Sequence, residues 1–147
     1  MSDDWAAVSA YFEALRERGW PETLDELDRL ELDDAAFVVL FEADAMITNG
    51  GFAGLFSNPS GRFAARLPAA AARFALREHE AAARTALAIF DVAYPSDFDE
   101  RDALWDEMID SRDHDVDDVI LESSDTTWYV AEPELHTALA CHARSRM

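Results

Sequence analysis

Four aspartates recur at helical spacing in the C-terminal half of this 147-residue chain, at Asp99, Asp102, Asp106 and Asp110. Steps of three, four and four residues place them on one side of a helix, with neighbouring Cβ atoms about 5–6 Å apart. Leu104, Trp105 and Met108 would lie on the opposite side and anchor the helix. Like charges at this spacing destabilise a helix by roughly 0.2–0.5 kcal/mol per pair. A rigid row of carboxylates can take the place of DNA phosphates before a groove lined with Arg and Lys, and such binding is strongly salt-dependent.

The charge of the whole chain is strongly negative and unevenly distributed. Asp and Glu number 31, the 12 basic residues are all Arg, and the formal net charge is −19. Residues 1–44 carry a net charge of −10, residues 45–90 carry +3 and residues 91–135 carry −14. Such a field repels nucleic acid and anionic membranes, and it attracts cations and basic proteins. The expected partner is therefore a basic protein rather than a nucleic acid or a membrane.

Adaptation to a salty cytoplasm, or the bias of a GC-rich genome, would explain the same composition. Both would give abundant Asp and Arg without Lys over a whole proteome. The near-neutral middle of the chain would then be its buried core helices, which carry few charges in any protein. A halophile-adapted helical domain remains an alternative to a protein-binding module.

Further acidic residues extend the candidate partner-binding surface. Asp113 and Asp117 follow the row, and a second patch comprises Asp25, Asp28, Asp33 and Asp34.

The acids alternate over residues 113–118 as they do in a calcium loop. Asp118 stands where such a loop needs Gly, and Ser124 stands where it needs a bidentate Glu. We expect a flexible acidic loop here. A metal-dependent protein that uses residues 113–118 is the alternative.

No other combination of residues predicts a catalytic centre. His79-Glu80 is followed by Ala83 rather than by the second His of a zinc-protease helix. His136 and His142 are six residues apart and would not share a helix face. The sequence holds neither a Gly-rich phosphate loop nor a credible Ser-His-Asp arrangement. We therefore predict a protein that is not an enzyme, with no catalytic residues, no metal site and no cofactor.

Helices are the expected elements, because Pro and Gly are few and Ala, Leu, Arg and Glu are abundant. The segment 35–48, with Asp33 as its cap, is apolar nearly all round and predicts a buried central helix. Residues 111–127 read as irregular and residues 128–130 as a short extended piece. Further helices are expected at about 4–18, after Thr23, and at 68–76, 79–90, 98–110 and 133–144. The prediction is an all-α, single-domain bundle of about six to seven helices around the central one, spanning residues 1–147.

Three features indicate a cytoplasmic protein. The single Cys141 cannot form an internal disulfide, which fits a reducing compartment. No uninterrupted apolar run approaches the eighteen or more residues of a membrane span. The acidic N-terminus lacks the positive region of a secretory signal.

A motif follows the predicted central helix, formed by Asn49, Gly50, Gly51, Phe52, Phe56, Asn58 and Gly61. In this helix-to-loop context the chain resembles the bacterial family named for a DNA-mimic protein, with a family-like core at about residues 35–95. Phe74-Ala75-Leu76 departs from the hydrophobic-Gly-Ala step that members often have. The resemblance implies an all-α fold and a non-enzymatic role, in which carboxylates occupy the DNA-binding surface of a regulatory protein.

The motif residues themselves are interpreted as structural. A helix stop, a tight turn and an aromatic plug explain them without a ligand. A homodimer paired through the near-neutral middle of the chain would leave both acidic blocks facing outward. The sequence is therefore compatible with a homodimer as well as with a monomer.

Overall fold

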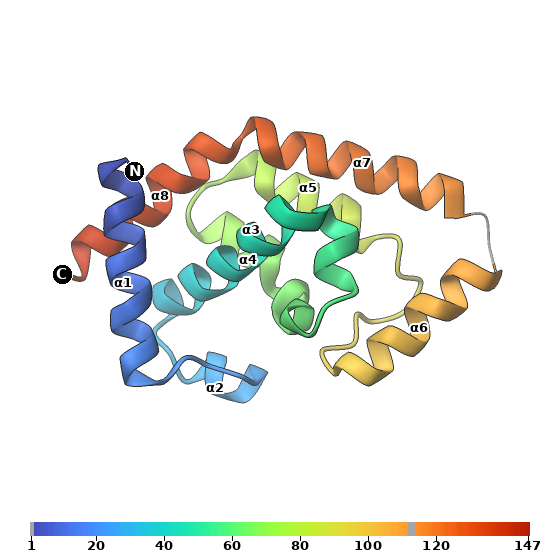
Figure 1. Ribbon diagram of the computed structural model, residues 1–147, viewed down its shortest axis with the longest axis horizontal. Coiled ribbons are helices and arrows are strands. Elements are labelled where there is room, and N and C mark those ends of the chain that lie inside the picture. The colour runs from blue at the N-terminus through green and yellow to red at the C-terminus, as the bar shows by residue number, and fades with distance from the viewer. Residues whose placement is uncertain (1, 112–113) are drawn as a thin grey trace.

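Helices form the regular structure of this protein. The computed structural model describes residues 2–111 and 114–147. Within these residues the chain forms eight α-helices and one 3₁₀ helix, without a β-strand. The predicted all-α class is confirmed, whereas the predicted count of six to seven helices is too low. The elements are α1 (Asp3–Gly19), α2 (Leu24–Asp28), α3 (Leu32–Phe56), η1 (Pro59–Arg66), α4 (Leu67–Arg73), α5 (Arg77–Leu87), α6 (Phe98–Ser111), α7 (His114–Val130) and α8 (Glu132–Ser145) (Figure 1).

Helix α3 is the buried central helix that the apolar segment 35–48 predicts. Phe37, Leu40 and Ile47 are 0% exposed, and the helix packs against η1, α4, α7 and α8. By length and composition alone α3 is apolar enough to cross a membrane, but 56% of its apolar window is buried within this protein. Its packing is that of a core helix, around which the other elements are arranged (Figure 1).

The start of α3 differs from the prediction that Asp33 caps it. The helix begins at Leu32, and its N-cap residue, Glu31, makes no side-chain capping bond. Asp33 and Asp34 lie inside the first turn, where carboxylates face the positive end of the helix dipole. Asp33 forms an ion pair with Arg73 at 2.6 Å. The prediction of Asp33 as the cap is therefore wrong.

The predicted helix stop at the Asn-Gly-Gly sequence is a kink within α3. Of the two adjacent glycines, Gly51 has a positive φ, of 68°, while Gly50 continues the first segment of the helix. The backbone N–H of Phe52 donates to Oδ1 of Asp125 at 2.7 Å, so a carboxylate of α7 caps the second segment from 73 residues away. A Cβ at position 51 would overlap that same carboxylate. The position requires glycine both for its backbone conformation and for space.

Helix α7 covers most of the segment predicted to be irregular and the whole of the predicted extended piece. Leu121, Ser124 and Trp128 are buried at spacings of three and four residues, on a face that packs against α5 and α3. Asp, Ser and Thr interrupt this short stripe, which is why the composition suggested a loop. Both predictions for residues 111–130 are wrong where the structure describes them.

Candidate functional site

The four-aspartate row lies on the solvent side of α6. This helix spans Phe98–Ser111, close to the predicted 98–110. Met108 is buried, Leu104 and Trp105 are half-buried, and the four aspartates are exposed. Helix α6 and the beginning of α7 lie at the opposite end of the molecule from the two termini (Figure 1). The row is therefore displayed at one end of the molecule.

Arg101 fixes α6 to the rest of the protein, and it is 0% exposed. Its Nε donates to the carbonyl oxygen of Phe56 at 2.8 Å, and its Nη2 donates to that of Asn58 at 2.6 Å. Its Nη1 donates to the carbonyl oxygens of Pro95 and Ser96 at 2.9 and 3.0 Å. Phe56 is the last residue of α3, so the guanidinium lies at the negative end of the central helix dipole. The charge of Arg101 is therefore buried against backbone carbonyl groups.

Sequence reasoning missed Arg101, although a signal was present. Residues 101, 104, 105 and 108 follow the spacing of one helix face. An arginine in line with that apolar stripe, inside an acidic run, indicates a buried cation with partners elsewhere in the fold. What the sequence did not indicate is that these partners are backbone carbonyls 43 and 45 residues away.

Motif residues at the end of α3 and in the following turn build the socket for Arg101. Phe52 and Phe56 are 0% and 1% exposed and plug the core. The side chain of Asn58 caps η1 by accepting from Ser60 N at 3.0 Å, while its carbonyl faces Arg101. A Cβ at Gly61 would overlap the carbonyl oxygen of Leu55.

Asn49, at the start of the motif, is exposed, and its side-chain amide donates to the carbonyl oxygen of Ala45 at 2.9 Å. In the structure, Phe56, Asn58 and Gly61 of this motif shape the end of α3 that holds α6.

Arginines from other elements pair mainly with acids of the first 44 residues. The pairs are Arg16–Glu13, Arg62–Glu42, Arg66–Asp28, Arg73–Asp33, Arg144–Asp4 and Arg146–Glu31. Within residues 2–111 and 114–147, no ion pair joins a carboxylate of α6 to a cation. Among the residues that the structure describes, the carboxylates of α6 thus have no cationic partner, whereas much of the acidity near the N-terminus is neutralised internally.

The predicted second patch is largely engaged in such internal contacts. Asp25 is exposed on α2, but Asp28 is held by Arg66, whose hydrogen bonds lower the pKa of that carboxyl. Asp33 pairs with Arg73, and this lowers the pKa of Asp33 in the same way.

Asp34 is the most embedded of the four. It accepts from Tyr11 at 2.5 Å and contacts Nε2 of His142 at 2.8 Å. Burial acts to raise the pKa of Asp34, but these hydrogen bonds and Arg146 together lower it below its ordinary value. Three of the four acids in the second patch therefore tie α2 and α3 to other elements.

The predicted acidic loop is helical where the structure describes it. Asp113 lies outside the described residues, and His114 begins α7. Asp117 is half-buried there and, with Asp118, borders a cavity of about 100 Å³ between α6 and α7. Ligand atoms of His114, Asp115 and Asp118 lie within 4.8 Å of one another, but all three residues are exposed. A helical turn does not wrap a cation as a calcium loop does.

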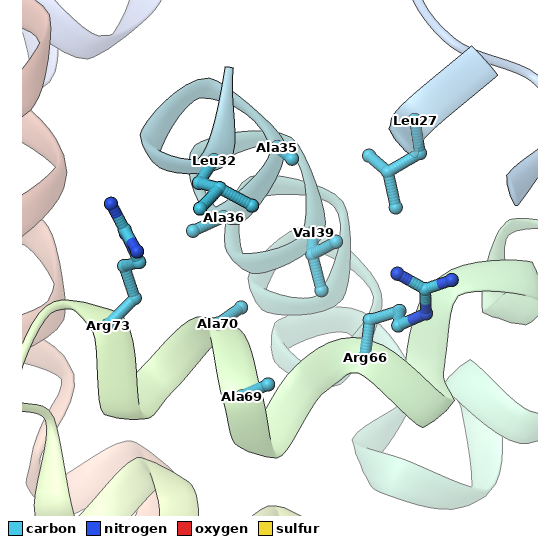
Figure 2. A pocket seen from close by; sticks show the side chains of 9 residues that line it. All are labelled: Leu27, Leu32, Ala35, Ala36, Val39, Arg66, Ala69, Ala70 and Arg73. Carbon is cyan, nitrogen blue, oxygen red and sulfur yellow. The ribbon is translucent and has the colours of Figure 1, made fainter. Parts of the chain in front are cut away.

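An apolar groove of about 280 Å³ lies between α3 and α4 (Figure 2). Leu32, Ala36 and Ala70 contribute to its wall, and Arg66 and Arg73 flank it. Both arginines already form ion pairs with aspartates of this chain. The groove therefore offers little free charge to a ligand.

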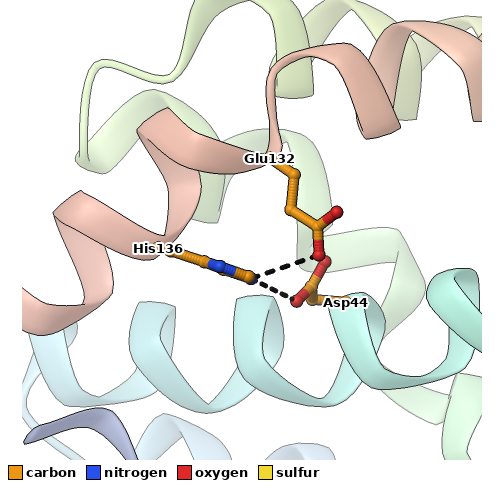
Figure 3. A group of neighbouring side chains, drawn as sticks. All are labelled: Asp44, Glu132 and His136. Atoms are coloured by element: carbon orange, nitrogen blue, oxygen red, sulfur yellow. Dashed lines mark hydrogen bonds and ion pairs between the residues drawn. The ribbon is translucent and has the colours of Figure 1, made fainter. Parts of the chain in front are cut away.

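A cluster of ionisable side chains lies between α3 and α8 (Figure 3). Nε2 of His136 is 3.1 Å from Oδ2 of Asp44 and 3.3 Å from Oε1 of Glu132. Asp44 is 6% exposed, and its Oδ1 accepts from Nε1 of Trp128 at 3.0 Å. The sequence did not bring these residues together, because the contact joins α3 to α8 across 92 positions.

Comparison with known proteins places the chain in a family. A family model described as DMP19-like protein matches residues 28–145, which extends well beyond the predicted family-like core and covers α3 to α8. This is the DNA mimic protein 19 family, and it is not known as an enzyme family. No curated protein and no solved structure matches the chain. With four-fifths of its length matched by the family model, the chain belongs to the DMP19-like protein family.

Proposed function

We propose that this protein is a non-enzymatic binding module that occupies the DNA-binding surface of a basic regulatory protein. The contact surface is the exposed face of α6, with Asp99, Asp102, Asp106 and Asp110 in place of phosphates. The observation that carries the proposal is that these carboxylates form no ion pair with any cation in residues 2–111 and 114–147, whereas acids near the N-terminus are neutralised internally. Membership of the DMP19-like family supports the same role.

The rigidity of α6 favours this function. A surface that imitates a nucleic-acid backbone must hold its charges in place, because ordering them at the moment of binding would reduce affinity. The guanidinium of Arg101 supplies that rigidity through hydrogen bonds to four carbonyl oxygens. The acids of α6 are therefore arranged before any partner arrives.

Exposed apolar side chains on α6 and α7 favour a protein as the partner. Ile109, Val116 and Val119 are 45%, 56% and 66% exposed. Apolar groups near the charged row would be buried against a protein surface, and their burial would add to the electrostatic attraction. A small cation would gain nothing from them.

Adaptation to high salt is the competing explanation of the acidity. It is favoured by the net charge of −19 and by the absence of lysine. It predicts a stability that rises steeply between low and molar salt, and it predicts no specific basic partner.

Capture of a partner from lysate of the source organism, followed by competition, tests the proposal. The immobilised protein should retain a DNA-binding regulator at low salt and release it at high salt or on addition of the duplex that the regulator recognises. The double variant Asp102→Asn with Asp106→Asn should retain less of it. The matched control, Glu17→Gln with Glu134→Gln, removes the same charge from exposed sites on α1 and α8 and should retain as much as the wild type. Failure to retain any DNA-binding protein at low salt would contradict the proposal.

A further inference from the structure

We propose that Asp44, Glu132 and His136 form a binding site for a divalent transition-metal ion, with Zn²⁺ as the expected occupant. The site lies between α3 and α8 and does not depend on the proposed function of α6. Its three side chains converge from two helices (Figure 3). Their ligand atoms all lie within 4.8 Å of one another.

The distances suit tetrahedral coordination. Bonds of about 2.0–2.2 Å to a tetrahedral zinc ion place its ligand atoms roughly 3.3–3.6 Å apart. Nε2 of His136 is 3.1 Å from Oδ2 of Asp44 and 3.3 Å from Oε1 of Glu132. Glu132 and His136 are four residues apart on α8 and therefore share one face of that helix. Small adjustments of the side chains would admit the ion.

The surroundings orient the ligands as the second shell of a metal site does. The indole N–H of Trp128 donates to Oδ1 of Asp44 at 3.0 Å, and this leaves Oδ2 directed at His136. The ring of His136 packs against Trp5, with centroids 5.4 Å apart. Both contacts limit the freedom of the ligating groups.

His79 supplies a second observation beside the cluster. Its ring meets the ring of Trp128 edge-on, with centroids 4.6 Å apart, and the residue is 1% exposed. Its Nε2 is buried and has no hydrogen-bond partner among the residues that the structure describes. His79 reaches the cluster through Trp128, whose indole N–H holds Asp44, and its own Nε2 is not among the converging ligand atoms.

Charge and access also suit a cation. Two carboxylates face one imidazole, and one of them, Asp44, is 6% exposed, so a divalent ion would neutralise charge that is held away from water. The side chains of Glu132 and His136 are 29% and 33% exposed, which leaves a path from solvent and an open position for water. One imidazole with two carboxylates suits Zn²⁺ better than Mg²⁺ or Ca²⁺, which prefer all-oxygen sites. The alternative is that the same three side chains form only a cluster of polar contacts that holds no metal ion.

Calorimetric titration of the chelator-treated, full-length protein with Zn²⁺ separates these possibilities. Salt at about 0.15 M, where the Debye length is about 8 Å, suppresses loose binding to the acidic surface. We expect one Zn²⁺ per chain, and we expect His136→Gln and Glu132→Gln each to weaken binding by about tenfold or more. Mg²⁺ and Ca²⁺ at the same concentration should not displace Zn²⁺.

Two control variants locate the site. Glu134→Gln removes the same charge as Glu132→Gln from an exposed position of the same helix and should leave the affinity unchanged. His114→Gln disables the exposed cluster of His114, Asp115 and Asp118 and should also leave it unchanged. Circular dichroism confirms that each variant is folded, and Asp44→Asn, which can keep its bond to Trp128, provides a third test of the site. Equal affinities of the wild type, His136→Gln and Glu132→Gln would overturn the proposal, as would loss of binding only in His114→Gln.

Discussion

The Nε atom of Arg101 donates a hydrogen bond to the carbonyl oxygen of Phe56 over 2.8 Å, and the bond joins the acidic helix α6 to the end of the central helix α3. The two residues are 45 positions apart. Between them the motif residues Asn58 and Gly61 shape the turn that completes the socket. The position of the exposed aspartates therefore depends on a buried cation and on glycine and asparagine residues remote from α6.

Substitution of Arg101 tests this arrangement. We expect Arg101→Met to lower the free energy of unfolding by about 3 kcal/mol, because it leaves buried carbonyl oxygens without a donor. Arg101→Lys should recover only part of this loss, since an ammonium group lacks the fork of donors. Urea denaturation measures both. Arg77→Met, at an exposed site of α5, is the control and should change stability by less than about 0.5 kcal/mol. A loss as small in Arg101→Met as in the control would refute the anchoring role.

The two adjacent glycines of α3 should respond in opposite directions to alanine. Gly51→Ala should destabilise the protein by about 2–3 kcal/mol, because its φ is 68° and the added Cβ would overlap the carboxylate of Asp125. Gly50→Ala should stabilise it by about 0.5–1 kcal/mol, since the position is helical and its Cβ would meet nothing within 4 Å. Thermal and urea unfolding of the two variants provide the comparison. Effects of the same sign would show that the kink is not specified at Gly51.

His79 should make the stability depend on pH. Burial lowers the pKa of His79 below its usual value of about 6.5, and His136 acts in the same direction. The charges of Asp44, Glu134 and Glu78 only partly offset this. The unfolded chain therefore binds a proton more readily than the folded protein, and the free energy of unfolding falls as the pH falls below about 6.5.

The measurement is urea unfolding between about pH 7.5 and pH 5.5 in the presence of a chelator, which keeps metal ions from the neighbouring cluster. His79→Gln cannot titrate, so its stability should fall less over this range than that of the wild type. Parallel pH dependences of the two proteins would exclude His79 as the source.

Neutralising part of the acidic row should raise stability while it lowers binding. Asp102 and Asp106 are four residues apart on α6, and like charges at this spacing destabilise a helix. We expect Asp102→Asn with Asp106→Asn to raise the free energy of unfolding by about 0.6–1.5 kcal/mol, because the double variant removes three like-charge pairs of the row at about 0.2–0.5 kcal/mol each. Substitution of carboxylates that are kept for the fold would instead lower the free energy of unfolding. Loss of stability in this double variant would indicate a structural role for the row.

Sequence reasoning predicted the parts of the fold that local patterns specify. The helix over 98–110 follows from apolar residues at helical spacing, and α3 follows from a segment that is apolar on all sides. Helix α7 was missed because its buried stripe of Leu121, Ser124 and Trp128 is short and sits in a polar segment. Its stability comes from packing on α5, which no local pattern reports.

The candidate sites likewise combine features that local sequence patterns specify with features that depend on tertiary contacts. The exposure of the aspartates of α6 follows from their spacing. That no described cation pairs with them became known only from the structure, which places arginines against Asp28, Asp33 and Asp4. The cluster of Asp44 with Glu132 and His136 depends on how α8 crosses α3, and sequence separation conceals it. The homodimer and the cytoplasmic location stay predictions from the sequence.

The claim that α6 stands in for the phosphates of DNA is tested most directly by competition on a captured regulator. Labelled duplex DNA bound to the regulator is titrated with this protein, and fluorescence anisotropy reports how much DNA remains bound. We predict complete displacement of the duplex, with an affinity that falls about tenfold to a hundredfold as salt rises from about 50 to about 200 mM. Displacement should be weaker for Asp102→Asn with Asp106→Asn and unchanged for Glu17→Gln with Glu134→Gln. A ternary complex of regulator, duplex and this protein would contradict the claim.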